Sequence, residues 1–318
     1  IDIELLRRRK ESVVDAMVQG QFAAFTESGM DLILGEAKFV APRTVQVALN
    51  DGGVRTLRGA DVVLNLGMSP YLPDIEGLGS AGAHTSETLL RLDSLPESII
   101  VLGGGYIGCE FADVLNTLGV EVTVVQRGPL LSAREDNEHS EGIAQAFLAA
   151  GITLRLGETA RRVSRADDGT VSLALDSGAI LTASELLVAV GRTPETSEIG
   201  LEQAGVRLTD RGFIAVDEYL RTSAERVWAA GDAAGTPQFT HASYDDYRVL
   251  ATNLAAQAGQ GELRSTQGRL IPYCVFTTPE LARVGLTEAE ARAAGYDVRI
   301  ARMPVAAIPR ARTIGHLE

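Results

Sequence analysis

The sequence of 318 residues predicts an α/β protein with more than one domain. A glycine-rich turn follows an apolar strand and opens a helix in the segment SIIVLGGGYIGCE, which begins at Ser98. Short runs of alternating apolar and polar residues, typical of strands, lie on both sides of this turn. A second apolar strand ends in Gly231-Asp232 ahead of another helical stretch. Strands that alternate with helices in this way indicate parallel sheets covered by helices.

Charge and hydropathy restrict the partners of the chain. The formal net charge of −13 disfavours nucleic acid and anionic membrane, because both present dense negative charge. The basic run Arg7 to Lys10 lies opposite Leu6, Val13 and Met17 in a helical pattern, which favours a solvated helix face over a binding patch. No apolar run reaches the roughly 20 residues of a membrane span, and the charged N-terminal stretch is unlike a secretory signal. We therefore expect a cytoplasmic protein.

Cysteine and histidine usage gives no sign of a metal or disulfide framework. Cys109 and Cys274 are the only cysteines and are far apart in sequence, so we interpret both as ordinary buried thiols. The histidines are isolated from one another, at His84, His139, His241 and His316. We expect no metal site.

The order of predicted elements divides the chain into four parts. Residues 2–20 form a predicted helix that stops at Gly20, and residues 32–66 form a predicted β-meander of three runs, the last of them DVVLNL. After the break at Leu95-Pro96-Glu97 the pattern continues with these elements: a strand, the glycine turn, a helix to about Leu118, a strand at 120–125, a helix at 137–150, short strands at 153–190, a strand at 227–230 and a helix at 242–258. A further strand-and-helix region starts near Ile271.

The glycine turn predicts a dinucleotide site at Gly103, Gly105 and Gly108. Glycine is needed because the turn is tight, the backbone approaches a pyrophosphate and the helix packs closely on its strand. Backbone N–H groups and the positive end of the helix dipole then hold the phosphates. A single G-x-G-x-x-G is weak evidence, but here the helix and a second parallel strand follow at the expected distances.

The end of the second strand predicts which coenzyme is bound. An acidic residue there hydrogen-bonds the ribose 2′-hydroxyl of NAD, whereas this chain has Gln126 and Arg127, with Arg134 further along the loop. Guanidinium groups suit a 2′-phosphate, so NADP(H) is favoured and NAD(H) is the alternative. The competing interpretation is that the two arginines only balance three acidic neighbours, Glu135, Asp136 and Glu138.

The segment VWAAGDAAGTPQFTH contains a second candidate site. Asp232 at the end of a strand is able to accept a hydrogen bond from a polyol hydroxyl, and the N–H groups of the following helix are able to stabilise negative charge on a bound ring. Taken alone, Gly231-Asp232 is more often only a turn.

Together these motifs resemble the flavin-dependent pyridine nucleotide-disulfide oxidoreductases, the family of glutathione reductase, dihydrolipoamide dehydrogenase and mercuric reductase. The resemblance covers the whole chain and rests on four motifs in the family's order: VVLNLGMSPYLPDIEGL, VLGGGYIGCE, LLVAVGRTPET and VWAAGDAAGTPQFTH. Within the family, PQFTHASYDDYR, PYCVFTTPELARVGLTEAEA and MPVAAIPRAR look most like the mercuric reductase-like branch and, within it, bacterial reductases linked to hypothiocyanous acid and copper stress.

The resemblance implies roles for individual residues. Asp232 would bind the FAD ribitol, and Gly231 would allow close approach of the flavin chain. Tyr106 matches the family's gating aromatic, which covers the flavin until nicotinamide displaces it, and Glu110 matches the acid that pairs with a lysine beside the flavin. The alternatives are a packing residue for Tyr106 and a solvated helix position for Glu110. The motifs place further cofactor-binding positions at Ile107, Gly67, Gly191, Gln238 and Phe239.

The chain also departs from the family pattern. Leu66 stands where Thr is usual, and Cys109 where a larger aliphatic residue is usual. The family's first FAD glycine turn, its C-x-x-x-x-C redox pair and its C-terminal His-Glu pair are not in this sequence, and His316 does not stand in for the family histidine. Because the first residue is not Met, we expect a piece of a longer protein.

The resemblance implies an α/β fold with two Rossmann-like three-layer domains, in which the NAD(P) domain is inserted in an incomplete FAD domain. The expected parts are residues 1–95 and 213–265 for FAD, 96–212 for NAD(P), and 266–318 for the start of an α+β dimerisation domain. The expected enzyme passes hydride from NADPH to FAD and on to a cysteine pair that this chain lacks. Its acceptor is a small molecule, a metal ion or a disulfide, and the full-length protein is a homodimer. The alternatives are a dihydrolipoamide dehydrogenase, a mercuric reductase, or a non-catalytic NADP-binding or sensing module.

Overall fold

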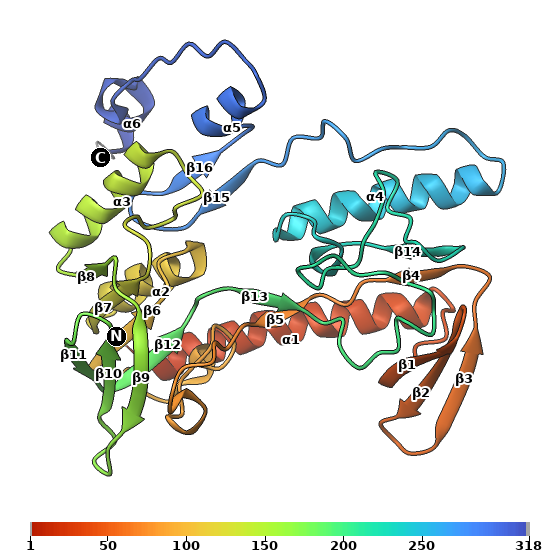
Figure 1. Cartoon of the computed structure of the whole chain (residues 1–318), viewed down its shortest axis with the longest axis horizontal. Helices are drawn as coiled ribbons and strands as arrows, with labels where there is room; N and C mark the ends of the chain where they lie inside the picture. Colours follow the sequence, from red (N-terminus) through yellow and green to blue (C-terminus); the bar gives the residue numbers. More distant parts are fainter. Residues whose placement is uncertain (1, 316–318) are drawn as a thin grey trace. The chain divides into compact units, whose positions relative to one another are not determined.

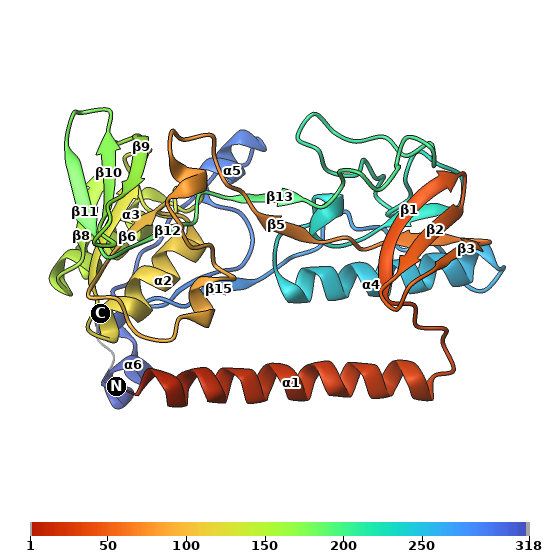
Figure 2. The same cartoon turned by 90° about the horizontal axis from the view of Figure 1, so that it is seen from below.

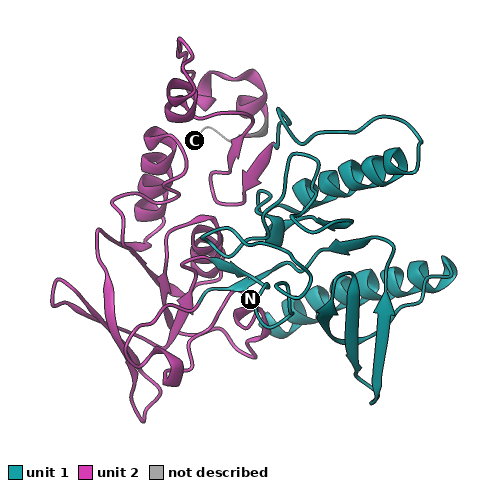
Figure 3. Cartoon of the chain, turned by 45° about the vertical axis from the view of Figure 1, so that its right-hand side comes forward, with its two compact units in different colours: residues 1–71, 192–271 teal, residues 72–191, 272–318 magenta. Residues whose placement is uncertain are grey.

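The chain folds into two compact units, and each unit is built from two separate segments (Figure 3). Unit 1 comprises residues 1–71 and 192–271, and unit 2 comprises residues 72–191 and 272–318. The computed structural model describes residues 2–315. These units do not test the limits of the cofactor domains that the sequence predicts, at residues 95, 212 and 265, and those limits stay predictions.

Unit 2 contains a four-stranded parallel sheet with the strand order β12-β6-β7-β8 (Figure 1). Its strands and two helices are β6 (Ser98–Leu102), α2 (Tyr106–Thr117), β7 (Glu121–Gln126), α3 (Asn137–Ala149), β8 (Thr153–Leu156) and β12 (Glu185–Val188). The predicted strand, turn, helix and strand between Ser98 and Gln126 are confirmed. Parallel strands buried on both faces read as continuous apolar runs, which is why SIIVL has no alternation.

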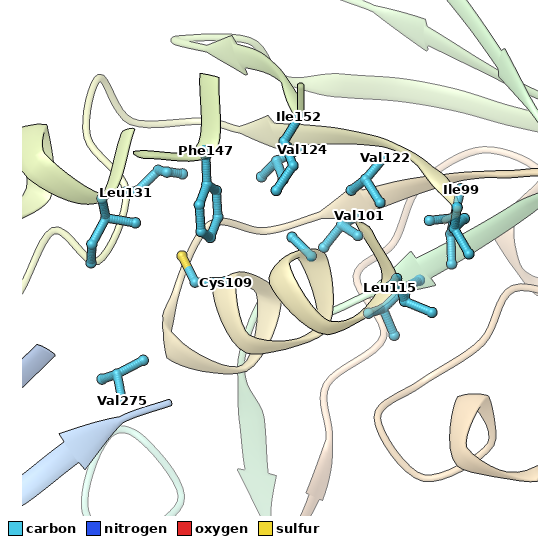
Figure 4. Close-up of a cluster of buried hydrophobic side chains, with 14 of the residues drawn as sticks. Ile99, Val101, Cys109, Leu115, Val122, Val124, Leu131, Phe147, Ile152 and Val275 are labelled. Carbon is cyan, nitrogen blue, oxygen red and sulfur yellow. The ribbon is translucent and has the colours of Figure 1, made fainter. Parts of the chain in front are cut away.

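The core of unit 2 lies between this sheet and helix α2 (Figure 4). Val101 and Val124 from the sheet and Phe147 from α3 are completely buried, and Cys109 of α2 lies among them. A side chain buried to this degree contributes about 1.5–3 kcal/mol relative to an exposed one. The glycine turn is therefore attached to the best-packed part of the unit.

A second sheet in unit 2 is antiparallel and has the order β11-β10-β9. Its strands and the two short 3-10 helices that precede the parallel sheet are η1 (Leu78–Ser80), η2 (Leu89–Arg91), β9 (Ala160–Arg165), β10 (Val171–Leu175) and β11 (Ile180–Ala183). Its buried face packs on Ile100, Leu186 and Val188 of the parallel sheet. The two sheets thus enclose a second apolar cluster.

The segment 272–315 also belongs to unit 2. Its elements are β15 (Tyr273–Val275), β16 (Leu281–Arg283), α5 (Glu288–Ala293), η4 (Val305–Ala307) and α6 (Pro309–Ile314). Val275 and Leu281 join the core of the parallel sheet, and a capping box between Thr287 and Glu290 starts α5.

Unit 1 contains three small sheets. Apart from the N-terminal helix described below, its elements are β1 (Gly35–Ala41), β2 (Thr44–Leu49), β3 (Val54–Arg58), β4 (Val62–Leu64), β5 (Met68–Pro70), β13 (Arg192–Pro194), β14 (Val227–Ala229), η3 (Asp232–Ala234) and α4 (Thr240–Gln257). The antiparallel meander β1-β2-β3 is confirmed, but the expectation that DVVLNL belongs to it is wrong. Strand β4 instead pairs in parallel with β14, and backbone hydrogen bonds join its two ends to Arg226 and Ala230.

Helix α1 (Ile3–Glu27) is longer than expected and runs without a break (Figure 2). The prediction that it stops at Gly20 is wrong, because one interior glycine costs only about 1 kcal/mol and good helix formers follow. The helix ends instead at Ser28, before Gly29 in a left-handed conformation. Both the basic residue Arg8 and the apolar residue Met17 are exposed, and the helix buries none of its described residues.

No helix among residues 2–315 has both the length and the apolar character needed to cross a membrane.

Candidate functional site

The glycine turn lies at the carboxyl end of β6, where Gly103 has a φ of 111°. A Cβ atom on Gly103 would stand 2.4 Å from the carbonyl oxygen of Ala189, at the end of the neighbouring strand β12. A Cβ atom on Gly108 would stand 1.9 Å from the carbonyl oxygen of Gly103. Only glycine allows this positive φ and these two close approaches.

Gly105, the N-cap of α2, has the opposite surroundings. It is exposed, and no atom lies within 4 Å of the place where its Cβ would stand. The first N–H groups of α2 have no partners within the helix, and no side chain caps them. An open backbone at a helix N-terminus fits a bound pyrophosphate.

Gln126 is tied to the turn. Its Oε1 accepts a hydrogen bond from the N–H of Gly104 at 3.0 Å, and its Nε2 donates to the carbonyl of Leu130 at 3.4 Å. Gln126 therefore supports the glycine turn itself, and its expected place beside the ribose stays a prediction.

Arg127 and Arg134 are exposed, and neither makes a hydrogen bond or an ion pair with a residue in the described range 2–315. Their acidic neighbours have other partners, which are Arg283 for Glu135, the N–H of Glu288 for Asp136 and Arg302 for Glu138. Neither arginine is directly paired with these carboxylates, and the choice between the two interpretations stays a prediction. Their guanidinium groups remain available to a ligand.

Tyr106 is the first residue of α2, and its hydroxyl donates a hydrogen bond to Oε1 of Glu135. The hydroxyl of Tyr273 donates to the same oxygen, and the two phenol oxygens lie 3.1 Å apart. Nε of Arg283 lies 3.5 Å from Oε2 of Glu135, whose side chain is only 3% exposed. Burial, and then the carboxylate of Glu135, raises the pKa of Tyr106, so its hydroxyl stays protonated and donates at neutral pH.

Three members of this cluster, Glu135, Tyr273 and Arg283, were not expected from the sequence as site residues. The loop after β7 and the two strands β15 and β16 are far apart in sequence, and no motif joins them. No signal in the sequence distinguishes Glu135 from the acidic residues beside it.

Glu110 on α2 accepts a hydrogen bond from the N–H of Phe276 at 2.9 Å, so its partner within unit 2 is backbone. Cys109 is fully buried on the same helix, and burial raises the pKa of its thiol to about 11. The expectation of a buried thiol is confirmed for Cys109 and wrong for Cys274, which is only partly buried in β15. Ile107 is half-buried beside them on α2.

The second candidate site lies in unit 1, at the end of β14. Gly231 has a φ of 70°, and a Cβ there would stand 2.8 Å from Oγ of Ser243 and 2.9 Å from Oδ1 of Asn65. The N–H of Gly231 donates at 2.7 Å to Oδ2 of Asp246, a fully buried carboxylate on α4. The turn is thus fixed by protein atoms on both sides.

Asp246 holds this turn through three bonds and was not expected from the sequence. Besides Gly231, it accepts from the hydroxyl of Thr236 at 2.6 Å and from NH1 of Arg269 at 2.6 Å. Its signal in the sequence was a pair of aspartates in the helix that follows the Gly-Asp turn.

Asp232 is half-buried in η3, and its carboxylate has no hydrogen-bond partner among the described side chains and backbone of residues 2–315. Burial raises the pKa of Asp232, and the charge of Arg192 opposes that rise. A partly desolvated carboxylate with free acceptor oxygens fits a polyol hydroxyl.

The remaining expected positions lie on loops around these two turns. Gly67 and Gly191 have positive φ and open surroundings, Gln238 is exposed, and the ring of Phe239 stacks on that of His241 with 5.6 Å between centroids. His316 lies outside the described residues.

A parallel sheet with a glycine turn and an open helix N-terminus defines a nucleotide-binding fold of the Rossmann type. The pattern of the pyridine nucleotide-disulphide oxidoreductases matches residues 3–246, and that of the dimerisation domain of the same family matches residues 271–318. The chain belongs to this family. Its members are flavin-dependent oxidoreductases that bind FAD and use NAD(P)H.

Several curated proteins are similar over nearly the whole chain. The probable pyridine nucleotide-disulfide oxidoreductase RclA of Escherichia coli is 36% identical over 96% of this chain and 69% of its own length. The mercuric reductases of Staphylococcus aureus and Streptomyces lividans are 34% and 36% identical over 98% of this chain, and the chain spans 56% and 65% of their lengths.

The solved structure of the HOCl-induced flavoprotein disulfide reductase RclA from Escherichia coli has a TM-score of 0.88 and 35% identity, over 98% of this chain and 70% of that one. These findings confirm the expected α/β fold and the resemblance to the mercuric reductase-like branch.

Proposed function

We propose that this chain is the coenzyme-binding part of an FAD-dependent enzyme that oxidises NADPH. The observation that carries the coenzyme choice is the pair of exposed guanidinium groups, Arg127 and Arg134, unpaired within residues 2–315 and following the strand that leads from the glycine turn. Guanidinium groups recognise phosphate with charge-assisted hydrogen bonds. NADH offers a hydroxyl at that position and gains less from them.

Different residues of unit 2 fit different parts of the nucleotide. The N–H groups at the start of α2 bind the pyrophosphate, and the open space beside Gly105 admits it. Arg127 and Arg134 bind the 2′-phosphate. Glu110 and Tyr106, on the same helix as Gly108, are the proposed residues of the nicotinamide end.

The residues of unit 1 fit FAD through the turn at Gly231. Asp232 accepts hydrogen bonds from the ribitol, while Asp246 keeps the turn in shape. Gly67, Gln238 and Phe239 are further proposed contacts. When both are bound, NADPH supplies a hydride and FAD accepts its two electrons for transfer to the acceptor.

The acceptor we propose is a metal ion, a disulfide or another small oxidised molecule. Two relatives support this class, since mercuric reductases are among them and RclA has been solved as a Cu(II) complex. The cysteine pair that would relay the electrons is not in this sequence, because Cys109 and Cys274 are both free and lie on separate elements. The match to a dimerisation domain supports a homodimer, and a cytoplasmic location stays a prediction.

The test is a comparison of coenzymes on the full-length protein loaded with FAD. We expect a flavin spectrum on purification and a Michaelis constant for NADPH at least tenfold below that for NADH, since one charged hydrogen bond contributes about 1.5–3 kcal/mol. A clear preference for NADH would overturn the coenzyme assignment. Purification without flavin would overturn the enzyme itself.

The free cysteines favour one alternative, a nucleotide-sensing module without catalysis. The gene upstream of Ile1 distinguishes the two proposals. A reading frame with a second G-x-G-x-x-G and a C-x-x-x-x-C favours the enzyme, and a start codon at this point favours the module.

A further inference from the structure

We propose that Arg269 is a positioning residue for FAD, which neutralises the buried carboxylate of Asp246 so that Asp246 holds the Gly231 turn in the shape that receives the cofactor. This inference rests on the proposed function, because it takes the Gly231 turn to be part of the FAD site. It adds a residue from the segment after α4, which none of the expected motifs contains. Arg269 acts through Asp246 and does not itself need to touch FAD.

Asp246 uses its two carboxylate oxygens for different partners. Oδ2 accepts from the N–H of Gly231 at 2.7 Å and from the hydroxyl of Thr236 at 2.6 Å, and Oδ1 accepts from NH1 of Arg269 at 2.6 Å. Gly231 and Thr236 lie on either side of η3, which contains Asp232. One carboxylate oxygen therefore joins the two ends of the short segment that carries the proposed ribitol acceptor.

The carboxylate of Asp246 depends on a counter-charge. Its side chain is completely buried, and a buried carboxylate without a partner takes up a proton instead of staying ionised. Among residues 2–315, the cation that forms an ion pair with Asp246 is Arg269. Without Arg269, Asp246 would hold the turn through hydrogen bonds between neutral groups, which are roughly half as strong as charge-assisted ones.

The charge balance also reaches Asp232. Burial raises the pKa of Asp232, the positive charge of Arg192 lowers it, and the negative charge of Asp246 raises it further. Asp246 therefore acts on the carboxylate that is proposed to accept hydrogen bonds from the ribitol. Because NH1 of Arg269 lies 2.6 Å from Oδ1 of Asp246, the positive charge of Arg269 offsets this repulsion.

The segment that carries Arg269 is itself held in place within unit 1. Asn253 is fully buried on α4, where it accepts from the N–H of Arg264 at 2.7 Å and donates to the carbonyl of Arg264 at 3.0 Å. The N–H of Thr266 donates at 2.8 Å to the carbonyl of Glu218. Since the backbone before Arg269 is fixed at these two points, little chain freedom is lost when its guanidinium forms the ion pair.

The experiment measures the dissociation constant of FAD on the full-length protein, from which the flavin is removed and to which it is then added back. Arg269→Met keeps the length of the side chain and removes the charge, whereas Asp246→Asn keeps an acceptor for the turn without the charge. We expect each to weaken FAD binding about tenfold, the typical effect of losing one charged hydrogen bond. The double variant with Arg269→Gln and Asp246→Asn replaces the ion pair by a neutral pair of similar shape, so its affinity should lie within about threefold of the wild type.

A second readout separates positioning of the turn from a general loss of stability. Site-resolved hydrogen exchange in the flavin-free protein follows the N–H of Gly231 and that of Ala230, which donates to the carbonyl of Leu64. In Arg269→Met we expect exchange at Gly231 to become about tenfold faster and exchange at Ala230 to change less than about twofold, because only the turn loses its support.

Arg264→Met is the matched control, because Arg264 lies on the same segment and pairs with Asp245 at 2.9 Å. It should change neither the affinity for FAD nor the exchange rate at Gly231. Equal weakening of FAD binding by Arg264→Met and Arg269→Met, no recovery in the double variant, or equal acceleration of exchange at Gly231 and Ala230 would each overturn the proposal.

Arg269→Lys takes the place of Arg269→Met if the latter does not fold. Lysine keeps the charge but not the planar guanidinium, so we expect FAD binding to weaken about threefold, and an unchanged affinity overturns the proposal. A wild-type protein that binds no FAD overturns the proposed function instead. In that case the exchange rates at Gly231 and Ala230 still decide whether Arg269 supports the turn.

Discussion

Gly108 and Gly103 are in direct backbone contact, since a Cβ atom on Gly108 would stand 1.9 Å from the carbonyl oxygen of Gly103. Gly108→Ala must therefore push helix α2 away from strand β6. Overpacking of this kind costs about 1–3 kcal/mol, and we expect at least this loss in the free energy of unfolding. Urea denaturation followed by circular dichroism measures it.

Gly105→Ala is the matched control, because no atom lies within 4 Å of its added Cβ. Its stability should change by less than about 1 kcal/mol, the typical cost of alanine at an N-cap. Its NADP⁺ affinity should fall, since the Cβ fills space that the pyrophosphate needs. Equal loss of stability in both variants would contradict this account of the turn.

Arg127→Ala and Arg134→Ala test the coenzyme preference. Each should raise the Michaelis constant for NADPH about tenfold, the typical effect of losing one charged hydrogen bond at a partly exposed site. The constant for NADH should change by less than about twofold, because no 2′-phosphate is lost. Arg91→Ala, at another exposed arginine of unit 2, should change neither. Equal losses for NADPH and NADH would place the arginines elsewhere on the nucleotide.

Asp246→Ala should be strongly destabilising. It leaves Arg269 without its 2.6 Å partner and the N–H of Gly231 without an acceptor, and breaking a buried pair typically costs about 3–5 kcal/mol. The neighbouring Asp245 pairs with Arg264 at 2.9 Å and with Arg269 at 3.3 Å, but it is partly exposed, so Asp245→Ala should cost only about 0–1 kcal/mol. Chemical denaturation of both variants gives the comparison. Similar values for the two would show that Asp246 does not anchor the turn.

Cys109 predicts a loss of stability in alkali. Its folded pKa is raised by burial from 9.0 to about 11, so the unfolded chain releases the thiol proton first as the pH rises. The stabilising contribution is fully present below pH 9 and falls by about 2 kcal/mol as the pH approaches 11. Denaturation of the wild type and of Cys109→Ala at pH 8 and at pH 10.5 isolates the contribution of the Cys109 thiol to the free energy of unfolding. An identical pH dependence in the two proteins would contradict it.

The sequence was sufficient to predict those parts of the fold that depend on residues close together in the chain. The need for glycine in this turn was predicted, and the structure shows a positive φ at Gly103, open space at Gly105 and a close helix contact at Gly108. Dinucleotide binding there stays a prediction. The parallel strands were predicted because burial on both faces leaves a continuous apolar run.

Prediction from sequence failed where distant segments meet. Nothing local distinguishes β4 from the meander before it, since its pairing with β14 depends on residues more than 150 positions later. Glu135 looks like one of several surface acids until Tyr273 and Arg283 are placed around it. Gly20 does not end its helix, because good helix formers follow it and one interior glycine costs only about 1 kcal/mol.

If the proposed coenzyme site is correct, the hydrogen bond from the N–H of Gly104 to Oε1 of Gln126 links coenzyme choice to the glycine turn. A lineage that adapts to NADH by placing aspartate at position 126 would shorten this side chain and leave the turn without its support. Arg127 and Arg134 have no such structural role, since neither makes a hydrogen bond or an ion pair with another residue in the range 2–315. Evolution of the coenzyme preference is therefore expected to proceed through the two arginines while Gln126 is retained, and redesign of this protein for NADH should follow the same route.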